Sequence, residues 1–390
     1  MRVLYCVLVI IIVVSMPINS VYADNKSDVE DELRTNISDS LDALDLSGLE
    51  DFIGEELDDN SACGHTVREY IEGIISGRFS LTFSDVLSNM ARRLFSGITS
   101  FLPLIVIVLS VSILYSIVDG MSSHFASRST SEIIYFVCYI TIIVAVVTTL
   151  VIIMRDAIRA TRKITRFMEL VFPVLLTLMT ALGGAVSTSV YKPMMLVLTT
   201  GVSEIISSLI IPIFIATIVF SIVGNLSTNI KLEKMTKSIK SVGSFILGTV
   251  FSLFTTFVTM QGITGATIDS VSIKSAKFAI SSYVPIVGGY ISDGFDLAYA
   301  GMVLIKNSLG YVGIMIVLAI TILPVVKIAL FILVLRLSSG IIEPICDARV
   351  SSFLYSVSEN LTLLIAVLLG IAFMFFIVSM LTILTLNVGL

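Results

Sequence analysis

The chain has 390 residues, of which 56% are hydrophobic and only 14% are charged, and its mean hydropathy is +1.02. A soluble domain carries roughly 25% charged residues, so this composition excludes a soluble enzyme, a disordered protein and a basic nucleic-acid-binding protein, and it indicates a polytopic membrane protein. The net charge of −5 is unevenly spread, because residues 24–96 carry 17 acidic and 6 basic residues whereas the body after them is mildly basic.

The first 23 residues have the features of a secretory signal peptide. Arg2 precedes an apolar run from Val3 to Val14, Pro17 ends that run, and Ala23 stands at a suitable cleavage position. We predict cleavage after Ala23, with an uncleaved N-terminal anchor as the alternative. A leader of this kind exports the segment that comes after it, so we expect residues 24–96 on the extracytoplasmic side.

Residues 24–96 are predicted to form a short acidic head that is partly helical. Apolar residues recur at helical spacing over 41–57, 70–75 and 83–94. So few large apolar groups make a weak core on their own. We therefore expect the head to be stabilised by the membrane, by the rest of the chain or by a partner.

Residues 97–390 are predicted to form an all-α transmembrane domain. About seven stretches reach the roughly 20 apolar residues that a spanning helix needs. They are Gly97–Val118, Ile133–Met154, Phe167–Val190, Met194–Val223, Gly243–Gly262, Leu309–Leu335 and Leu361–Val388.

The segment 278–305 is also apolar, but proline, glycine and aspartate residues interrupt it. Irregular backbone at membrane depth is tolerated only where it is buried in protein or lines a cavity. This segment therefore predicts a broken or re-entrant helix, with an interfacial loop as the alternative.

Two basic stretches bear on the orientation in the membrane. Residues 155–166 carry five Lys/Arg and residues 224–242 carry four. As loops between the predicted spans they fall on one side, and the positive-inside rule then places both of them, and the head, in the cytoplasm. The signal peptide places the head outside, and we give it slightly more weight because a leader acts first.

The sequence shows no catalytic motif. It has only two histidines, His65 and His124, and it has no nucleophile elbow, zinc-binding helix or phosphate-binding loop. Cys63 and His65 stand close together, but no second pair completes a zinc site. We predict a protein that is not an enzyme, with no cofactor and no metal. If it uses energy, a partner must supply that energy.

Ionisable residues inside apolar stretches are expensive and are candidate functional residues. Glu204, Lys306 and Lys327 stand in such stretches, and Asp293 and Asp296 are spaced to share one helical face. One interpretation is a polar pathway or an ion-paired hinge. The alternative is structural pairing, or snorkelling of Lys306 to the membrane interface.

The stretch from residue 277 to residue 293, KFAISSYVPIVGGYISD, resembles the signature region of the stage III sporulation protein AE family. The leader, the acidic head and the polytopic body resemble the layout of that family over the whole chain. The resemblance carries over no catalytic residue. It points to one candidate functional motif, completed here by the nearby Asp296, whose residues are Pro285, Gly288, Gly289, Ser292, Asp293 and Asp296.

The resemblance implies a subunit of the complex that endospore-forming bacteria build between mother cell and forespore, similar to a specialised secretion system or feeding channel. The implied partners are a cytoplasmic ATPase, small membrane subunits and ring-forming proteins. The implied location is the mother-cell-derived membrane around the forespore, as a multi-pass protein in the lipid bilayer.

Two functional hypotheses result. The first is a membrane subunit of this complex that supports late forespore development and forms part of a translocation path. The alternative is a stand-alone, ion-coupled secondary transporter of a small solute that uses Asp293, Asp296 and Glu204.

Overall fold

In the computed structural model every regular element of the described residues is a helix. Six of these helices are long and apolar enough to cross a membrane, which confirms an all-α, polytopic membrane architecture. The described residues are 37, 40–42, 44–56, 67–75, 99–118, 120, 128–226, 232–283 and 288–387. The predicted signal peptide and the helical pattern over 83–94 lie outside them.

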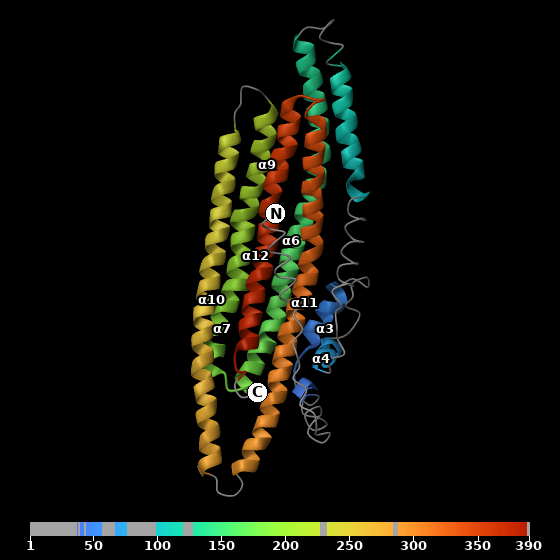
Figure 1. Ribbon diagram of the computed structural model, residues 1–390. Coiled ribbons are helices and arrows are strands. Elements are labelled where there is room, and N and C mark those ends of the chain that lie inside the picture. The colour runs from blue at the N-terminus through green and yellow to red at the C-terminus, as the bar shows by residue number, and fades with distance from the viewer. Residues whose placement is uncertain are drawn as a thin grey trace.

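Two short helices precede the bundle, α3 (Ser47–Glu56) and α4 (Val67–Ile75), and the first long helix is Thr99–Val118 (Figure 1). The remaining elements are α6 (Arg128–Ala181), α7 (Ala185–Leu196), η1 (Val197–Val202), α8 (Ser203–Ile205), η2 (Ile206–Ile210), α9 (Ile211–Leu226), α10 (Glu233–Tyr283), α11 (Gly288–Ile342) and α12 (Ala348–Leu384). We call the end of the bundle where α10 ends and α11 begins the hairpin end.

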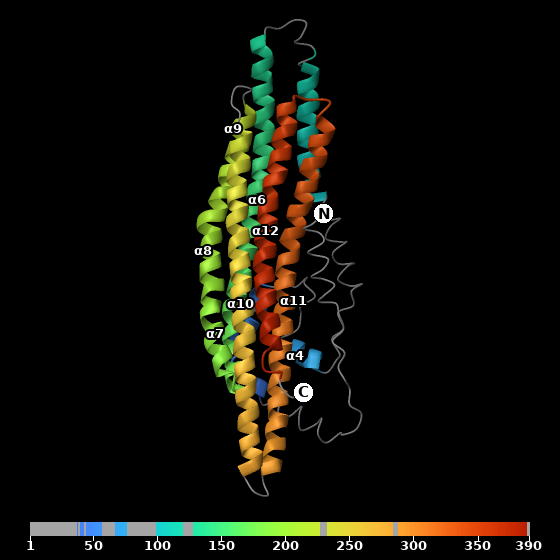
Figure 2. The same ribbon diagram turned by 60° about the vertical axis from the view of Figure 1, so that its left-hand side comes forward.

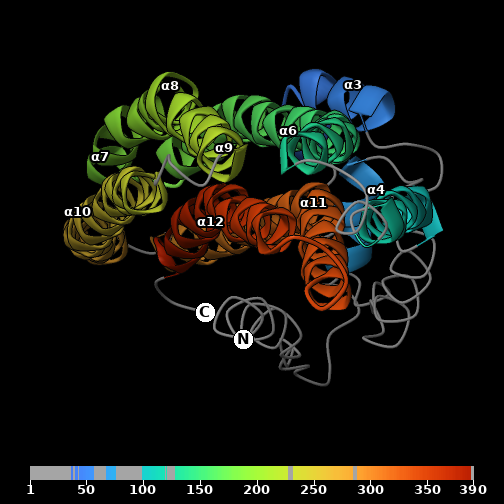
Figure 3. The ribbon, with the colours of Figure 1, turned by 90° about the horizontal axis from the view of Figure 1, so that it is seen from above.

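The long helices run side by side in two rows, and α12 stands in the middle of the second row (Figure 3). Seen along the bundle, α6 and the segment α7–α9 form one row, and α10, α12 and α11 form the other (Figure 3). Helix α12 packs against α11, α10, α9 and α6. In its most apolar window 67% of the residues are buried, against 22% for α10, so α12 forms the centre of the core.

Three helices are much longer than a bilayer requires. Helices α6, α10 and α11 have 54, 51 and 55 residues. At 1.5 Å per residue each is about 80 Å long, whereas the hydrocarbon core of a bilayer is about 30 Å thick. The elongated bundle in Figure 2 must therefore extend well beyond the hydrocarbon core.

Helix α6 corrects the predicted number of spans and the predicted basic loop. It contains the predicted span 133–154, most of the predicted span 167–190 and the basic stretch 155–166 between them. The stretch 155–166 continues the helix because its small and apolar residues face the core. Ala157, Ala160 and Ile164 are buried, while the arginines face outward. The result is six candidate spans where about seven were predicted.

The same helix overturns the charge argument on orientation, which assumed two basic loops on one side. Residues 155–166 are not a loop but lie midway along α6. Residues 224–242 flank the connection between α9 and α10, at the end of the bundle opposite the hairpin end (Figure 1). The two stretches therefore lie at different levels of the bundle.

The segment 278–305 is a chain reversal between two long helices. Its first residues complete α10, which ends at Tyr283, and α11 begins at Gly288 and continues through Gly294 and Asp296. The connection 284–287 lies outside the described residues. The structure has no broken helix within 288–305.

The acidic head packs on the bundle. In α3, Phe52 is buried with its ring centroid 5.5 Å from that of Phe167 in α6, and α4 packs against α11. Arg68 of α4 pairs with Asp42 at 2.6 Å. Of the three expected sources of stability for the head, the structure shows packing against the rest of the chain.

Candidate functional site

The most buried charge near the hairpin end is Lys306, on α11. Its side chain is fully buried. Its Nζ donates a hydrogen bond to the carbonyl oxygen of Ile383 at 3.3 Å and another to that of Thr385. The last carbonyls of a helix have no partner within the helix and carry partial negative charge. Lys306 therefore neutralises the C-terminal end of α12 rather than snorkelling to an interface.

A second buried charge, Asp269 on α10, performs the opposite task. Its carboxylate accepts hydrogen bonds from the backbone N–H groups of Val186, at 3.0 Å, and Ser187, at 2.7 Å. These N–H groups belong to the first turn of α7, where a helix has free donors and partial positive charge. Asp269 therefore caps α7 from a different helix.

The sequence analysis did not single out Asp269, because the residue lies between the predicted span Gly243–Gly262 and the segment 278–305 and so outside every apolar stretch considered there. The signal was present in the sequence. Asp269 is the first charged residue after the uncharged stretch 241–268. A carboxylate that ends a long apolar stretch is a candidate to cap a buried helix N-terminus.

Hydroxyl groups complete this region, which we call the helix-end cluster: Asp269, Lys306, Tyr191, Tyr299 and Thr385. The hydroxyl of Tyr299 donates to the carbonyl oxygen of Leu386 at 2.7 Å. The hydroxyls of Tyr191 and Thr385 lie 3.3 Å apart. Leu386 has a positive φ of 64°, so the chain after α12 turns sharply where these groups bind it.

Close backbone contacts hold the same region together. A Cβ at Gly262 on α10 would stand 2.8 Å from the Tyr191 hydroxyl, and one at Gly265 would stand 3.2 Å from Ser187 Oγ. Gly184, just before α7, would bring a Cβ within 2.6 Å of a methyl group of Leu386. The glycines thus let α10, α7 and the end of α12 approach closely enough for the buried charges to reach their partners.

Lys327 lies away from this cluster, about half-way along the bundle. Its Nζ is 3.0 Å from a carboxylate oxygen of Asp156 on α6, and Arg159 approaches the same carboxylate at 3.6 Å. The side chain of Lys327 is 45% exposed. Lys327 thus takes part in structural ion pairing between α11 and α6, one of the two roles expected for it.

Glu204 stands on the outer surface, in the short helix α8 between two π-helical turns, η1 and η2. Its carboxylate accepts a hydrogen bond from Ser208 Oγ at 2.5 Å, one turn further along the same segment. A widened turn re-aims a side chain and is frequent at functional positions. Glu204 does not face the helix-end cluster and belongs to no common site with Lys306.

The described residues of the predicted motif lie at the hairpin end. Gly288 and Gly289 open α11, and Asp296 pairs with Lys277 of α10. Pro285 and the side chains of Ser292 and Asp293 lie outside the described residues. Lys306 stands further along α11. The predicted site residues that the structure describes therefore lie at different levels of the bundle and do not converge on one site.

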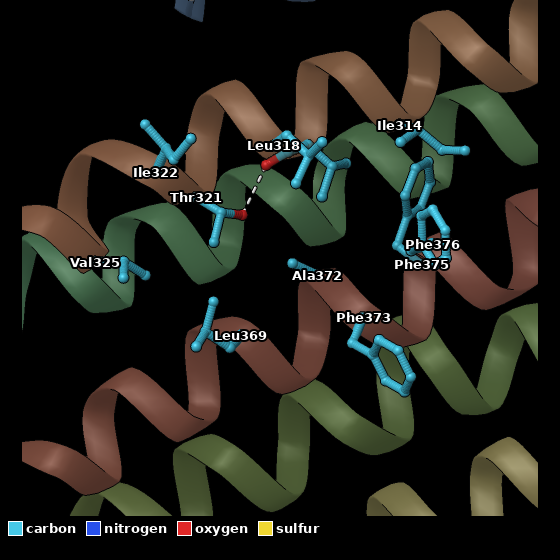
Figure 4. Close-up of a pocket in the computed structure, with 11 residues that line it drawn as sticks. Ile314, Leu318, Thr321, Ile322, Val325, Leu369, Ala372, Phe373, Phe375 and Phe376 are labelled. Carbon is cyan, nitrogen blue, oxygen red and sulfur yellow. Dashed lines mark hydrogen bonds between the residues drawn. The ribbon is translucent and has the colours of Figure 1, made fainter. Parts of the chain in front are cut away.

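A shallow pocket between α11 and α12 is almost wholly apolar (Figure 4). Leu318, Ile322 and Phe376 are among its lining residues. The polar side chain in it, Thr321, donates its hydroxyl proton to the carbonyl oxygen of Val317 at 2.7 Å. The pocket therefore suits an acyl chain or an apolar side chain and has no free group for a polar solute.

The polar groups described in this subsection stabilise the fold. They contain no group of three or more His, Cys, Asp or Glu side chains arranged for a metal ion. The two buried charges, Lys306 and Asp269, are each engaged by a helix end. The arrangement stabilises chain ends inside an apolar bundle.

Comparison with known proteins identifies a family with the same body. A family model described as "Stage III sporulation protein AE" matches residues 65–386. The chain is 23% identical over 302 residues to "Stage III sporulation protein AE" of Bacillus subtilis (strain 168), and the alignment covers 77% of this chain and 76% of that protein. No solved structure matches the chain.

Proposed function

Because the chain belongs to the stage III sporulation protein AE family, we propose that it is a membrane subunit of a sporulation-specific complex that links mother cell and forespore. The observation that carries the proposal is the extent of the family match, which runs over residues 65–386 and includes every helix from α4 to α12. A role in sporulation follows from the family. Membership of a secretion or feeding channel is the step that we propose.

The packing of the bundle supports a role as one wall of a path rather than as a complete channel. The aromatic rings of Phe167 and Phe172 on α6 lie 6.1 and 5.6 Å from that of Phe375 on α12. Tyr139 packs on Phe353 nearer the other end. Side chains thus fill the space around α12, and we place any translocation path between copies of the chain or between the chain and its partners.

We propose further that the partners are an ATPase, small membrane subunits and ring-forming proteins, and that the chain lies in the mother-cell-derived membrane. The head supports this assignment, since its described residues include exposed acids such as Glu50, Asp51 and Glu55. An acidic surface attracts basic partner surfaces over distances of about a Debye length, roughly 8 Å at physiological salt.

Purification of a tagged copy from sporulating cells, in mild detergent, tests the complex. Mass spectrometry should recover the ATPase and the ring-forming proteins with the tagged chain. A tagged, unrelated multi-pass protein from the same cells should not recover them. Recovery of the tagged chain alone, while the partners are present in the membrane fraction, would contradict the proposal.

The alternative, an ion-coupled transporter, makes a different prediction. Purified chain in sealed vesicles should then move a solute down an ion gradient without any partner. Two of the three residues assigned to it argue against it, because Asp296 is exposed and paired with Lys277, and Glu204 is exposed and accepts a hydrogen bond from Ser208 of its own segment. Gradient-driven uptake by the wild-type chain that the Glu204→Gln variant abolishes would favour the transporter and overturn the channel-subunit proposal.

A further inference from the structure

The outward face of α6 divides into three zones along its length. The first zone is mostly apolar, with two threonines whose hydroxyls bond the helix backbone, the second carries four arginines and the third is mostly polar. Spacings of three to four residues place all of them on one helical face. The exposed residues between 133 and 180, in chain order, are Ile133, Phe136, Val137, Ile140, Thr141, Val144, Thr148 and Ile152, then Arg155, Arg159, Arg162 and Arg166, then Glu169, Pro173, Thr177 and Thr180.

The apolar zone has the length of a bilayer core. Residues 133–154 span about 33 Å as a helix, close to the roughly 30 Å of hydrocarbon. The neighbouring helix Thr99–Val118 covers the same level in the opposite direction, since Phe101 packs on Phe331 near the Ile152 end of the zone and Tyr115 packs on Tyr135 near its start, with ring centroids 5.4 and 6.0 Å apart. On α11 the exposed apolar residues Leu333 and Leu337 come after Lys327, on the side away from the hairpin end.

The arginine zone stands where this apolar surface ends. The ion pair between Asp156 and Lys327 marks the same level on α11. A guanidinium group offers a planar fork of donors that matches a phosphate, and its long apolar stem lies easily along a hydrocarbon boundary. Four such groups on one face form a surface for anionic headgroups.

The third zone carries the head and therefore lies in water. Helix α3 packs here, because Phe52 contacts Phe167 and a Cβ at Gly48 would stand 3.3 Å from Leu170. The exposed acids of α3, such as Glu50 and Asp51, would be very costly in hydrocarbon. The boundary of the bilayer thus lies between Ile152 and Glu169 on α6.

On the opposite edge of the bundle, the apolar surface lies nearer the hairpin end. The uncharged stretch 241–268 of α10 begins after Lys240, which reaches the carbonyl oxygen of Glu359, and it passes Leu381 at Gly262. The apolar zone of α6 instead passes Phe353 at Tyr139. A tilted bundle brings the two surfaces to one level, and transmembrane helices are tilted by about 20° on average and by up to about 40°.

We propose that Arg155, Arg159, Arg162 and Arg166 form a binding surface for the phosphate headgroups of anionic phospholipids, at one boundary of a bundle that crosses the bilayer obliquely. The remainder of α6 and the head then stand in water beyond that boundary. This assignment is independent of the channel-subunit proposal, since it concerns the bilayer alone.

Electron paramagnetic resonance on the full chain tests the position of the boundary. Single cysteines replace Ile140, Arg159 or Thr177 in a chain whose own cysteines are substituted, and each is spin-labelled in vesicles of phosphatidylcholine and phosphatidylglycerol. Collisions with oxygen should dominate at position 140, collisions with a water-soluble nickel chelate should dominate at position 177, and position 159 should lie between them. An oxygen-dominated signal at position 177 would overturn the proposal.

Lipid preference tests the arginines themselves. The variant with all four arginines changed to Gln, once it elutes as a folded species, should lose the preference for spin-labelled phosphatidylglycerol over phosphatidylcholine by severalfold. Lys274→Gln, an exposed lysine on α10, is the control for a change of charge and should retain the preference. The proposal would be overturned if the wild-type chain showed no preference for phosphatidylglycerol, or if the four-fold variant kept the preference. It would also be overturned if the arginines bound an acidic protein and not the anionic lipid.

Discussion

Lys306 is a buried cation whose partners are backbone carbonyl oxygens at the end of α12. Methionine has a similar length but no donor, so Lys306→Met leaves these carbonyls without a hydrogen bond in an apolar region. An unsatisfied buried polar group costs about 1–3 kcal/mol. We expect the melting temperature of the purified chain in detergent to fall by several degrees, as measured by loss of the folded peak on heating.

Lys274→Met is the matched control, because Lys274 lies exposed on α10. Its melting temperature should stay close to that of the wild type. The same buried position also tests the charge. Replacement of a buried ion by an apolar side chain stabilises some proteins, and a rise in the melting temperature of Lys306→Met would mean that desolvation of the ammonium outweighs its hydrogen bonds.

Asp347 is the N-cap of α12, and its carboxylate accepts hydrogen bonds from the backbone N–H and the guanidinium of Arg349 at 2.7–3.0 Å. Burial raises the pKa of this carboxyl, but the hydrogen bonds from Arg349 outweigh burial and hold the pKa below its ordinary value. At neutral pH, Asp347→Ala should lower the stability by about 1 kcal/mol, the usual contribution of an N-cap.

The pH dependence of this difference is set by the sign of the shift. The carboxyl of Asp347 has a lower pKa in the folded state, so it contributes its full stability above the unfolded pKa near 3.9 and loses that part as pH falls through the folded pKa. The gap in melting temperature between wild type and Asp347→Ala should shrink below about pH 4. A gap that is constant from pH 7 to pH 3 would contradict a role for the ionised carboxylate.

Some of these residues could be recognised from the sequence, but their partners could not. Lys306 and Lys327 stand out because a charge in an apolar stretch is rare. The carbonyl oxygens that bind Lys306 belong to the end of α12, more than 70 positions away, and no local pattern indicates them. The partners of Asp269 could not be predicted for a related reason, since they are backbone N–H groups of α7 and leave no mark on the side-chain pattern.

At the scale of elements, the crossing of α10 and α12 depends on one glycine. A Cβ at Gly370 would collide with the ring of Phe251. We expect Gly370→Ala to destabilise the chain by forcing the two helices apart, despite the better helix propensity of alanine by up to about 1 kcal/mol. Gly248→Ala on α10 is the control, because a Cβ there meets no atom within 4 Å and should leave the stability unchanged or raise it.

A double variant extends this test by also removing the ring of Phe251. Combining Gly370→Ala with Phe251→Ala should give a smaller loss than the sum of the two single variants, because the added methyl group occupies space that the ring has left. Thermal unfolding in detergent measures all four proteins. Strict additivity would show that the two helices do not meet at this crossing.

The predicted helices were correct in kind and inaccurate in extent. The charges of the stretch 155–166 suggest an aqueous connection and so predict a loop. The helix continues there because Ala157, Ala160 and Ile164 keep the core-facing period. The period of the buried face, rather than the mean hydropathy, joins the two predicted spans into one helix.

At the scale of the whole molecule, composition alone was enough to predict the class. A chain with 56% hydrophobic residues and 14% charged residues has to place a large apolar surface in lipid. The position of the head was not predictable, because the apolar residues of α3 indicate a buried face without indicating what covers it. That face packs against the second half of α6, through Phe52 and Phe167.

A cross-link in the full chain tests this position of the head. Cysteines at Gly48 and Leu170 should be joined by a short thiol-specific reagent, because a Cβ at Gly48 would stand 3.3 Å from the Leu170 side chain. The pair Gly54 and Leu170 is the control, since a Cβ at Gly54 meets no atom within 4 Å. Reaction of the first pair, read as a joined peptide pair by mass spectrometry, places the head on the part of α6 that lies beyond the arginines. Equal reaction of both pairs would mean that the head moves freely over the bundle. Another part of the protein or a partner would then have to pack on the surface of α6 beyond Arg166.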